Sequence, residues 1–359
     1  MNKDSEKKIQ KVKGPDDIKV LTILLNQVCN FSCAYCYSAK GRSKTILQEE
    51  TLKTALDFFI RKERGDNLQI VFSGGGDPMV SFDRFRMAVD YAFCKAHKEE
   101  LKLDIDVVTN GSLLDNQAID YIKEKGIGLV VSFDVLKDVH DTQRSHYDIV
   151  ASTISKLIEN RIGFGIRCTV TPLNVNRLCE TIEELHKRFS NIKCIALEAV
   201  INKELFSGTD KLREFYDSFI ENFTAAKKIG KQYGIDVGNT EYMNAAAFQE
   251  RSCLSKFVLT PEGNLTACSR ISSSNEDFHD DFLYGKVCAD SIVIDYDRYN
   301  NIMEEADAYL PECKDCMARW HCGGGCLLAR KTYSKEYFKE HCRFICRITE
   351  IAQNDNELD

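Results

Sequence analysis

Apolar segments rich in β-branched residues alternate with longer amphipathic segments over the first two thirds of the chain. The apolar segments predict β-strands at residues 20–25, 68–72, 105–108, 129–132, 164–170 and 194–197. The segments between them have a helical period and predict helices at residues 49–61, 82–98, 115–125, 147–160 and 174–189. Gly126 and Gly163 stand where a helix would end and the next strand would begin. The pattern is that of repeated strand–helix units.

Such units in series predict a parallel sheet covered by helices. This describes a full or partial α/β barrel, and it equally describes an open, doubly wound sheet. In both folds the functional residues gather at the carboxyl ends of the strands. The loops that follow the predicted strands are therefore where we expect the chemistry.

The last third of the chain has a different character, and we expect a domain boundary near residue 240. A long polar helix at 211–234 precedes this point, and the chain is then rich in cysteine, short elements and turns. The sequence predicts a flexible amino terminus at residues 1–18, a barrel domain at 19–240, a small cysteine-rich α+β domain at 241–348 and an acidic tail at 349–359.

Composition narrows the classes of function. A net charge of −7 and the lack of a dense Lys/Arg stripe argue against nucleic acid as the main partner. No apolar run reaches the roughly 18 residues of a membrane span, and the start lacks the apolar core of a secretion signal. We therefore expect a cytoplasmic protein without membrane contact. Disulfides are disfavoured in a reducing cytosol, so sixteen cysteines favour metal binding.

Three cysteines, Cys29, Cys33 and Cys36, stand in one short segment directly after the first predicted strand. Three thiolates in one loop can hold three irons of a [4Fe–4S] cluster and leave the fourth iron open to a substrate or cosubstrate. A structural zinc site is the alternative. Zinc normally takes four protein ligands, with a second cysteine pair further on, so the C-x3-C-x2-C spacing favours the cluster.

The run C-x3-C-x-Tyr-C after the first strand resembles the radical S-adenosylmethionine (radical SAM) superfamily. In that family the open iron binds the amino and carboxylate groups of SAM. The reduced cluster cleaves SAM to methionine and a 5′-deoxyadenosyl radical, which abstracts hydrogen from the substrate. The resemblance favours a partial (β/α)6 TIM-like barrel over an open sheet. It also implies a reductant such as flavodoxin or ferredoxin as a partner.

Loops after later strands match the positions that contact SAM in this family. The second predicted strand leads into Ser-Gly-Gly-Gly-Asp-Pro, which is similar to the family's Gly-Gly-Glu-Pro loop at the methionyl amine. The resemblance therefore implies SAM contacts for Gly75, Gly76 and Asp77, although a plain tight turn also explains such a loop. It places Ser132 near the carboxylate or ribose of SAM. It places Tyr35 near the adenine, with simple packing over the cluster as the alternative.

Arg167 is a cation within an otherwise apolar predicted strand. An unpaired charge is costly inside a sheet, so we expect an anionic partner for it. Glu198, at the end of the sixth strand, is an internal candidate, whereas the resemblance implies the carboxylate of SAM. We favour SAM, because a guanidinium suits the bidentate binding of a carboxylate.

A second group of cysteines follows a more specific spacing. Two of them flank a predicted hairpin with strands at 257–260 and 265–268. The full pattern, C-x14-C, a gap, C-x2-C-x5-C-x3-C, a gap and a last C, resembles the SPASM domain, an extension of radical SAM enzymes that carries auxiliary clusters. The resemblance implies two further [4Fe–4S] clusters, one held by Cys313, Cys316, Cys322 and Cys342 and the other by Cys253, Cys268 and Cys326.

The second of these sets has only three ligands. Cys288 is a candidate for the fourth position, and an open iron that binds substrate is the rival. Cys346, one helical turn beyond Cys342, could also ligate, although an unused thiol is the simpler interpretation. Zinc is an alternative in this region, because C-x2-C pairs also build zinc ribbons.

SPASM proteins mostly modify peptides or proteins. The resemblance therefore implies a maturase that abstracts hydrogen from a ribosomally made peptide and forms a thioether or carbon–carbon crosslink or a related oxidation. A sulfatase-maturing, formylglycine-forming enzyme is one alternative, and a small-molecule oxidation or decarboxylation is another. Sulfatase-maturing enzymes typically place an Asp after the second hairpin cysteine, whereas Ser269 and Arg270 follow Cys268. Only about 18 residues precede the first strand, which leaves no room there for a domain that holds a leader peptide. We therefore expect a separate protein to bind the leader peptide.

Overall fold

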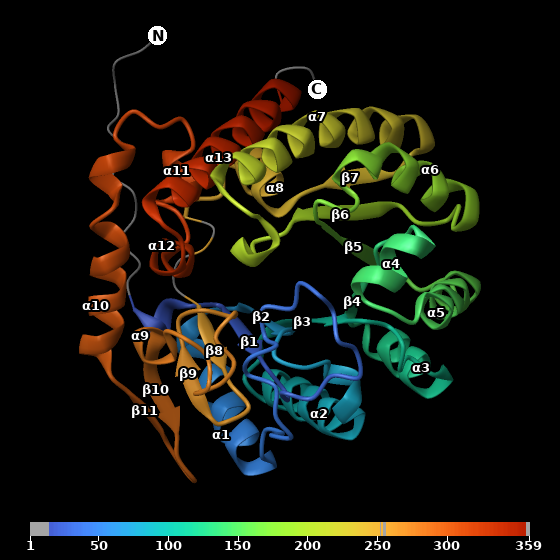
Figure 1. Cartoon of the computed structure of the whole chain (residues 1–359). Helices are drawn as coiled ribbons and strands as arrows, with labels where there is room; N and C mark the ends of the chain where they lie inside the picture. Colours follow the sequence, from blue (N-terminus) through green and yellow to red (C-terminus); the bar gives the residue numbers. More distant parts are fainter. Residues whose placement is uncertain (1–13, 252, 254–255, 357–359) are drawn as a thin grey trace.

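The computed structural model describes residues 14–251, 253 and 256–356 (Figure 1). The strands of this part of the chain form one sheet in the order β11-β10-β9-β8-β1-β2-β3-β4-β5-β6-β7. The strands are β1 (Val20–Ile23), β2 (Asn67–Phe72), β3 (Lys102–Thr109), β4 (Gly128–Ser132), β5 (Phe164–Val170), β6 (Cys194–Ala199), β7 (Asp236–Gly238), β8 (Phe257–Leu259), β9 (Asn264–Thr266), β10 (Leu283–Val287) and β11 (Ile292–Ile294). The α-helices are α1 (Glu49–Phe59), α2 (Phe82–Lys98), α3 (Asn116–Lys125), α4 (Lys137–Gln143), α5 (Tyr147–Glu159), α6 (Leu178–Arg188), α7 (Thr209–Tyr233), α8 (Thr240–Ala246), α9 (His279–Phe282), α10 (Tyr296–Asp307), α11 (Arg319–Cys322), α12 (Leu327–Thr332) and α13 (Lys335–Asn356).

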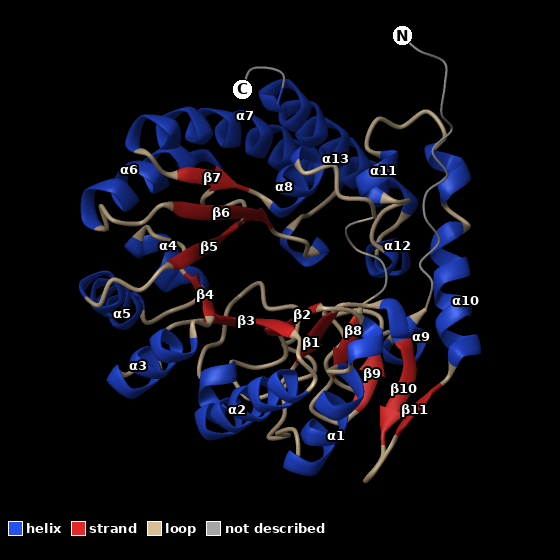
Figure 2. Cartoon of the chain, turned by 180° about the vertical axis from the view of Figure 1, so that it is seen from behind, coloured by secondary structure: helices blue, strands red, loops and turns tan. Residues whose placement is uncertain are grey.

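The first strands form the partial α/β barrel that the sequence predicts. Strands β1 to β6 pair in parallel and in chain order, and β7 adds in parallel to β6. Each predicted strand and helix of this part is present within a few residues of its expected bounds. Figure 2 shows the strands on the inside of a curve and the helices outside it. The loops at the carboxyl ends of these strands therefore meet on one side of the barrel.

The barrel strands have an apolar outer face and a more polar inner face, as β2 illustrates. In β2, Ile70 and Phe72 are buried, and the ring of Phe72 lies 4.9 Å from that of Phe85 in α2. Gln69, at the alternate position, instead donates a hydrogen bond to Asp106 of β3 at 2.6 Å. Side chains alternate between the two faces of a strand. The polar residues at these alternate positions therefore project into the barrel interior.

The cysteine-rich region continues the sheet of the barrel. Strand β8 pairs in parallel with β1, with Leu21 opposite Phe257. Strands β9, β10 and β11 then extend the sheet in antiparallel fashion. The predicted hairpin is present as β8 and β9. The domain boundary near residue 240 stays a prediction, and main-chain pairing joins the two sides of it.

The carboxy-terminal helix α13 packs beside α7 (Figure 1). It continues to Asn356, so the acidic tail expected from residue 349 onward is helical over residues 349–356. The physical reason is apolar burial, since Ile348 and Ala352 are fully covered on one face of the helix. Residues 357–359 lie outside the described part of the chain.

Most of the amino terminus that we expected to be flexible, residues 1–13 of 1–18, lies outside the described residues. From residue 14 the chain packs on the barrel, with Pro15 buried in a short 3₁₀ helix, η1 (Pro15–Asp17). The guanidinium of Arg64 donates hydrogen bonds to the carbonyls of Pro15 at 2.7 Å and Asp16 at 2.8 Å. In the part of the chain that the structure describes, no helix has the length and apolar character of a membrane span.

Candidate functional site

The C-x3-C-x2-C run lies in the loop that follows β1, at the carboxyl end of that strand. Neighbouring elements hold the loop in place. Phe31 is buried, and its ring lies 5.1 Å from that of His146. The Ala34 N–H donates a hydrogen bond to the Gln143 carbonyl at the end of α4 at 2.8 Å. The loop is thus folded against the chain between α4 and α5.

The three thiols of this loop lie close enough together to influence one another. Burial raises the pKa of Cys33, the Arg144 guanidinium opposes this, and the neighbouring Cys36 and Cys29 raise it further. The Cys29 sulfur accepts a hydrogen bond from the N–H of Phe31 at 3.4 Å. Clustered sulfurs with N–H donors around them suit an iron–sulfur cluster. Their role as ligands stays a prediction.

Arg42 is a cation beside this triad that the sequence reasoning missed. Its Nη2 donates a hydrogen bond to Cys36 Sγ at 3.3 Å, and its Nη1 donates to the Phe31 carbonyl at 2.9 Å. One guanidinium therefore connects both ends of the cysteine loop and places a positive charge next to the Cys36 sulfur. The signal that could have revealed it is the basic sequence Lys40, Arg42 and Lys44 directly after the triad.

Tyr35 belongs to a buried polar network behind the triad. Its hydroxyl accepts a hydrogen bond from Arg144 Nη1 at 2.6 Å and donates one to Asp134 Oδ2 at 3.1 Å. Asp134 also accepts from the Thr169 N–H at 2.9 Å. Burial, followed by the charge of Asp134, raises the pKa of Tyr35 well above its usual value. The hydroxyl is engaged in this network, and a contact of Tyr35 with SAM stays a prediction.

The glycine loop after β2 packs closely against the segment that follows β1. The Gly76 N–H donates to the Asn26 carbonyl at 2.7 Å. A Cβ at Gly76 would stand 1.9 Å from the Val28 oxygen, and one at Gly75 would stand 2.6 Å from the Asn26 oxygen. Gly75 also has a φ of +67°, a left-handed conformation that favours glycine. The glycines therefore permit a close approach of two loops, and their contacts with SAM stay predictions.

Asp77 is buried, with 4% of its surface exposed. Its carboxylate accepts hydrogen bonds from the N–H groups of Met79 at 2.9 Å and Asn110 at 2.6 Å, and from the Thr109 hydroxyl at 2.9 Å. Burial raises the pKa of Asp77 in spite of these bonds. Through these hydrogen bonds Asp77 holds the loops after β2 and β3 together. A direct contact of its carboxylate with SAM stays a prediction.

Arg167 and Ser132 are opposite each other in the register of β4 and β5. The Arg167 side chain is 47% exposed, so the premise that its strand buries the charge is wrong, because the side chain projects into the barrel interior. Its Nη2 lies 3.6 Å from Oε1 of Glu198, the internal partner that we considered. Glu198 also accepts a hydrogen bond from the Thr240 hydroxyl at 2.5 Å. The exposed part of the Arg167 guanidinium remains accessible to a carboxylate ligand.

Arg270 connects the cysteine-rich region to the first site. Its guanidinium lies 5.3 Å from the ring of Tyr37 and donates a hydrogen bond to the Ile201 carbonyl at 3.1 Å. A Cβ at Gly74 would come within 3.1 Å of the Tyr37 hydroxyl. The residue after Cys36 therefore stands where the glycine loop and the segment after β9 meet.

The cysteines at 313, 316, 322 and 342 come together from separate segments. Burial raises the pKa of Cys342 to about 11, Arg330 opposes this, and Cys313 and Cys316 add to the rise. Burial, the charge of Glu241 and the other three thiols together raise the pKa of Cys322. Each thiol therefore lies within electrostatic reach of the others, as one cluster would require.

The other set, Cys253, Cys268 and Cys326, also lies together. Cys253 donates a hydrogen bond to Cys326, and this bond raises the pKa of Cys253 and lowers that of Cys326. Burial and the nearby Cys326 raise the pKa of Cys268 to about 11. The end of the hairpin and the start of α12 thus bring the three sulfurs into one group.

Cys288 does not join this group, so its candidacy as a fourth ligand is wrong. It is exposed and follows β10. Strand β10 begins with Leu283 opposite Thr266, beside Cys268, and then runs antiparallel to β9 toward the hairpin turn. Five residues of strand at about 3.3 Å each separate the two thiols by at least about 15 Å.

The three thiol groups fit iron–sulfur chemistry. Among the described residues, no three His, Cys, Asp or Glu side chains are arranged as ligands of one metal ion. A four-iron cluster does not need that arrangement, because each thiolate binds a different iron. All the expected ligands are sulfurs, and in the first group Arg42 and a backbone N–H donate hydrogen bonds to them.

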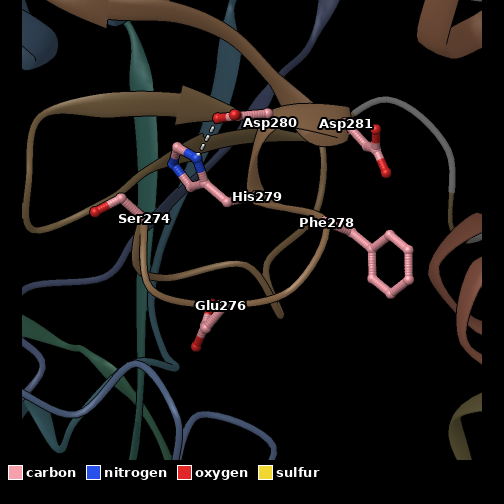
Figure 3. A pocket seen from close by; sticks show the side chains of 6 residues that line it. All are labelled: Ser274, Glu276, Phe278, His279, Asp280 and Asp281. Atoms are coloured by element: carbon pink, nitrogen blue, oxygen red, sulfur yellow. Dashed lines mark hydrogen bonds and ion pairs between the residues drawn. The ribbon is translucent and has the colours of Figure 1, made fainter.

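A separate pocket of about 300 Å³ lies on the segment between β9 and β10 (Figure 3). It is lined by Ser274, Glu276, Phe278, His279, Asp280 and Asp281. His279 Nδ1 lies 3.0 Å from Asp280 Oδ1, and the Glu276 carboxylate accepts a hydrogen bond from the Ser272 N–H at 2.6 Å. The lining side chains include no thiol, so we do not count the pocket as part of the candidate site.

This chain resembles known proteins in sequence and in fold. The sequence model of the Radical SAM superfamily matches residues 23–185, which include the cysteine triad and the glycine loop. This part of the chain is a radical SAM domain. Radical SAM enzymes use SAM and a [4Fe–4S] cluster.

Curated relatives match the chain over different lengths. An uncharacterised protein from Methanocaldococcus jannaschii is 28% identical over 176 residues, which cover 47% of this chain and 59% of that protein. The radical SAM cyclopropyl synthase TigE from Paramaledivibacter caminithermalis is 25% identical over 42% of this chain and 34% of its own length. The cysteine-type anaerobic sulfatase-maturating enzyme of Clostridium perfringens is 21% identical, over 89% of this chain and 90% of its own.

Solved structures share the fold over most of the chain. The sulfatase-maturating enzyme anSMEcpe with bound AdoMet has a TM-score of 0.75 at 18% identity, and the match covers 93% of this chain and 99% of that one. Streptococcus suis SuiB bound to its precursor peptide SuiA has a TM-score of 0.61 at 14% identity, over 89% and 74% of the two chains. At these identities the likeness is one of fold. This likeness in fold agrees with the match of residues 23–185 to the Radical SAM superfamily.

Proposed function

We propose that this protein is a radical SAM/SPASM peptide maturase that abstracts hydrogen from a ribosomally made peptide. The observation that carries the proposal is the gathering of ten cysteines into three separate groups, at positions that match the family pattern. When bound, a reduced [4Fe–4S] cluster and SAM supply the 5′-deoxyadenosyl radical. A single catalytic cluster would need only the first of the three groups, so the other two support a SPASM-type activity.

The residues of this chain have distinct roles in the proposed site. Arg42 holds the cysteine loop and donates a hydrogen bond to the Cys36 sulfur. Asp77 fixes the loops after β2 and β3 around it. Arg167 offers a partly exposed guanidinium in the middle of β5, which suits the carboxylate of SAM. Ser132 lies opposite it in the neighbouring strand.

Two solved structures of the same fold contain a bound peptide, and this supports a peptide substrate. SuiB was solved with its precursor peptide, and anSMEcpe was solved with a peptide as well. We propose that the peptide binds where the cysteine-rich region meets the first site, beside the contact of Arg270 with Tyr37. We further propose a flavodoxin- or ferredoxin-type reductant and a separate protein that binds the leader peptide.

Maturation of a sulfatase is the second candidate. The full-length match to the sulfatase-maturating enzyme of C. perfringens favours it. The residue after Cys268 argues against it, because Ser269 and the cation Arg270 stand where that group typically has an acidic base. The Arg270 guanidinium faces the Tyr37 ring and cannot take up a proton at neutral pH.

The two candidates differ in the product that they form. The anaerobically reconstituted protein would be incubated with SAM, a reductant and one of two probes, followed by mass spectrometry. One probe is the short peptide encoded beside the gene, and the other is a peptide from a cysteine-type sulfatase. A crosslink removes two hydrogens from the first probe, whereas formylglycine formation in the second replaces the cysteine sulfur by oxygen and also removes two hydrogens. Modification of the sulfatase peptide alone would overturn the maturase proposal.

A further inference from the structure

Cys346 contacts the auxiliary thiols without belonging to the four that match the family pattern. It lies on α13, one helical turn after Cys342, so both side chains are on the same face of the helix. Its sulfur is 3.4 Å from Cys316 Sγ, which is within hydrogen-bond distance for two sulfurs. The fifth thiol of this region is therefore in direct contact with an expected cluster ligand.

The expected ligand set leaves no position for Cys346. A four-iron cluster takes four cysteine ligands, one on each iron, and Cys313, Cys316, Cys322 and Cys342 fill these positions. Cys316 forms the C-x2-C pair with Cys313, and it lies within electrostatic reach of Cys322 and Cys342. Cys346 lies beside this group, within electrostatic reach of Cys316 and Cys342.

Cys346 carries a proton that it can donate. A thiol that does not ligate a metal keeps an S–H group, which is a weak hydrogen-bond donor. The ligating partner is a thiolate and accepts. The N–H of Ala318 donates in turn to the Cys346 sulfur, which orients the thiol.

We propose that Cys346 is a positioning residue, an S–H donor to the sulfur of Cys316 that raises the reduction potential of the auxiliary cluster held by Cys313, Cys316, Cys322 and Cys342. Hydrogen bonds to ligand sulfurs stabilise the reduced, more negative state of an iron–sulfur cluster. This hydrogen bond from α13 therefore sets how readily the cluster takes up an electron. The inference rests on the proposed auxiliary cluster and goes beyond it.

The test compares Cys346→Ala and Cys346→Ser with the wild-type chain after anaerobic reconstitution. Iron per chain and the potential of each cluster, followed by electron paramagnetic resonance during a redox titration, are the two measurements. Cys288→Ala is the matched control, because this thiol is exposed and lies at the far end of β10. Cys342→Ala is the control for loss of a ligand.

We expect Cys346→Ala to keep the wild-type iron content and to lower the potential of one cluster only. Cys346→Ser keeps a donor and should hold the potential at or above the wild-type value, whereas Cys288→Ala should change nothing. A loss of iron in Cys346→Ala equal to that in Cys342→Ala would make Cys346 a ligand and overturn the inference. Unchanged potentials would overturn it as well. Wild-type protein without auxiliary clusters would instead refute the proposed function on which the inference rests.

Discussion

Arg42 Nη2 donates a hydrogen bond to the sulfur of Cys36 at 3.3 Å. The cation follows the cysteine loop in sequence and returns to it in space, where it also binds the carbonyl of Phe31. A charged donor next to a ligand sulfur lowers the cost of adding an electron to the cluster. The pair therefore connects loop structure with the ease of reduction on which cleavage of SAM depends.

Replacing Arg42 by alanine should lower the potential of the first cluster by about 40 mV, which corresponds to about 1 kcal/mol for one electron. Arg42→Lys keeps the charge but not the fork that reaches both Cys36 and Phe31, so it should fall in between. The measurement is a redox titration followed by electron paramagnetic resonance. Lys44→Ala, an exposed cation of the same loop, is the control. An unchanged potential in Arg42→Ala would show that the hydrogen bond has no electronic effect.

Asp77→Asn should destabilise the fold by about 1–3 kcal/mol, because the amide end of the new side chain cannot accept the hydrogen bonds that the carboxylate accepts. Met79, Asn110 and Thr109 all donate to that carboxylate in a buried place. Denaturant unfolding checks this. Asp83→Asn, at an exposed position in the first turn of α2, should leave the unfolding free energy unchanged. Equal stability of the two variants would mean that Asp77 does not organise these loops.

Arg167→Gln should weaken the binding of SAM roughly tenfold to hundredfold, as expected for the loss of a charge-assisted contact. Equilibrium dialysis with the reconstituted protein gives the dissociation constant. Arg177→Gln is a matched control, since Arg177 pairs with Asp138 and Glu180 on the surface. If Arg167 serves only its ion pair with Glu198, SAM binding will stay at the wild-type level in Arg167→Gln, and the proposed contact fails.

The stability of the protein should fall as the pH drops from 7 to 5, and His140 should be one cause. Burial, followed by Arg144, lowers the pKa of His140 to about 3. Its Nδ1 accepts a hydrogen bond from the Asp134 N–H, so a second ring proton has no place there. A pKa below the unfolded value near 6.5 gives stability that is full above pH 6.5 and is lost as the pH falls toward 3.

For this histidine the loss amounts to about 2 kcal/mol between pH 7 and pH 5. Urea unfolding at the two pH values measures it. His140→Gln cannot take up the proton and should reduce the pH dependence by that amount, whereas exposed His97→Gln should not. The same slope in all three proteins would exclude His140 as the cause.

Local pattern was enough to predict the strands and helices, and the family resemblance predicted the barrel and the cysteine groups. Neither was enough for contacts made across the sheet. Period and spacing depend on neighbouring residues, so the strands of the barrel and the hairpin that carries Cys268 could be read from the sequence. The pairing of β8 with β1 depends on tertiary packing, which no local pattern encodes. The same holds for Cys288. The direction in which β10 runs along β9 places this thiol away from the other cysteines. The roles of Arg42 and Asp77 likewise depend on where loops meet.

The amount of iron in the reconstituted protein tests the three thiol groups. Three four-iron clusters correspond to roughly twelve irons per chain. Four irons together with bound zinc would leave the first site in place and refute the auxiliary clusters.

The most direct test of the central claim is the formation of 5′-deoxyadenosine from SAM after anaerobic reduction of the reconstituted protein. We expect wild-type protein and the Cys288→Ala control to form it, and Cys29→Ala to form none, because Cys29 belongs to the first group and Cys288 to no group. Equal product from Cys29→Ala, or no product from wild-type protein that carries its clusters, would contradict the account.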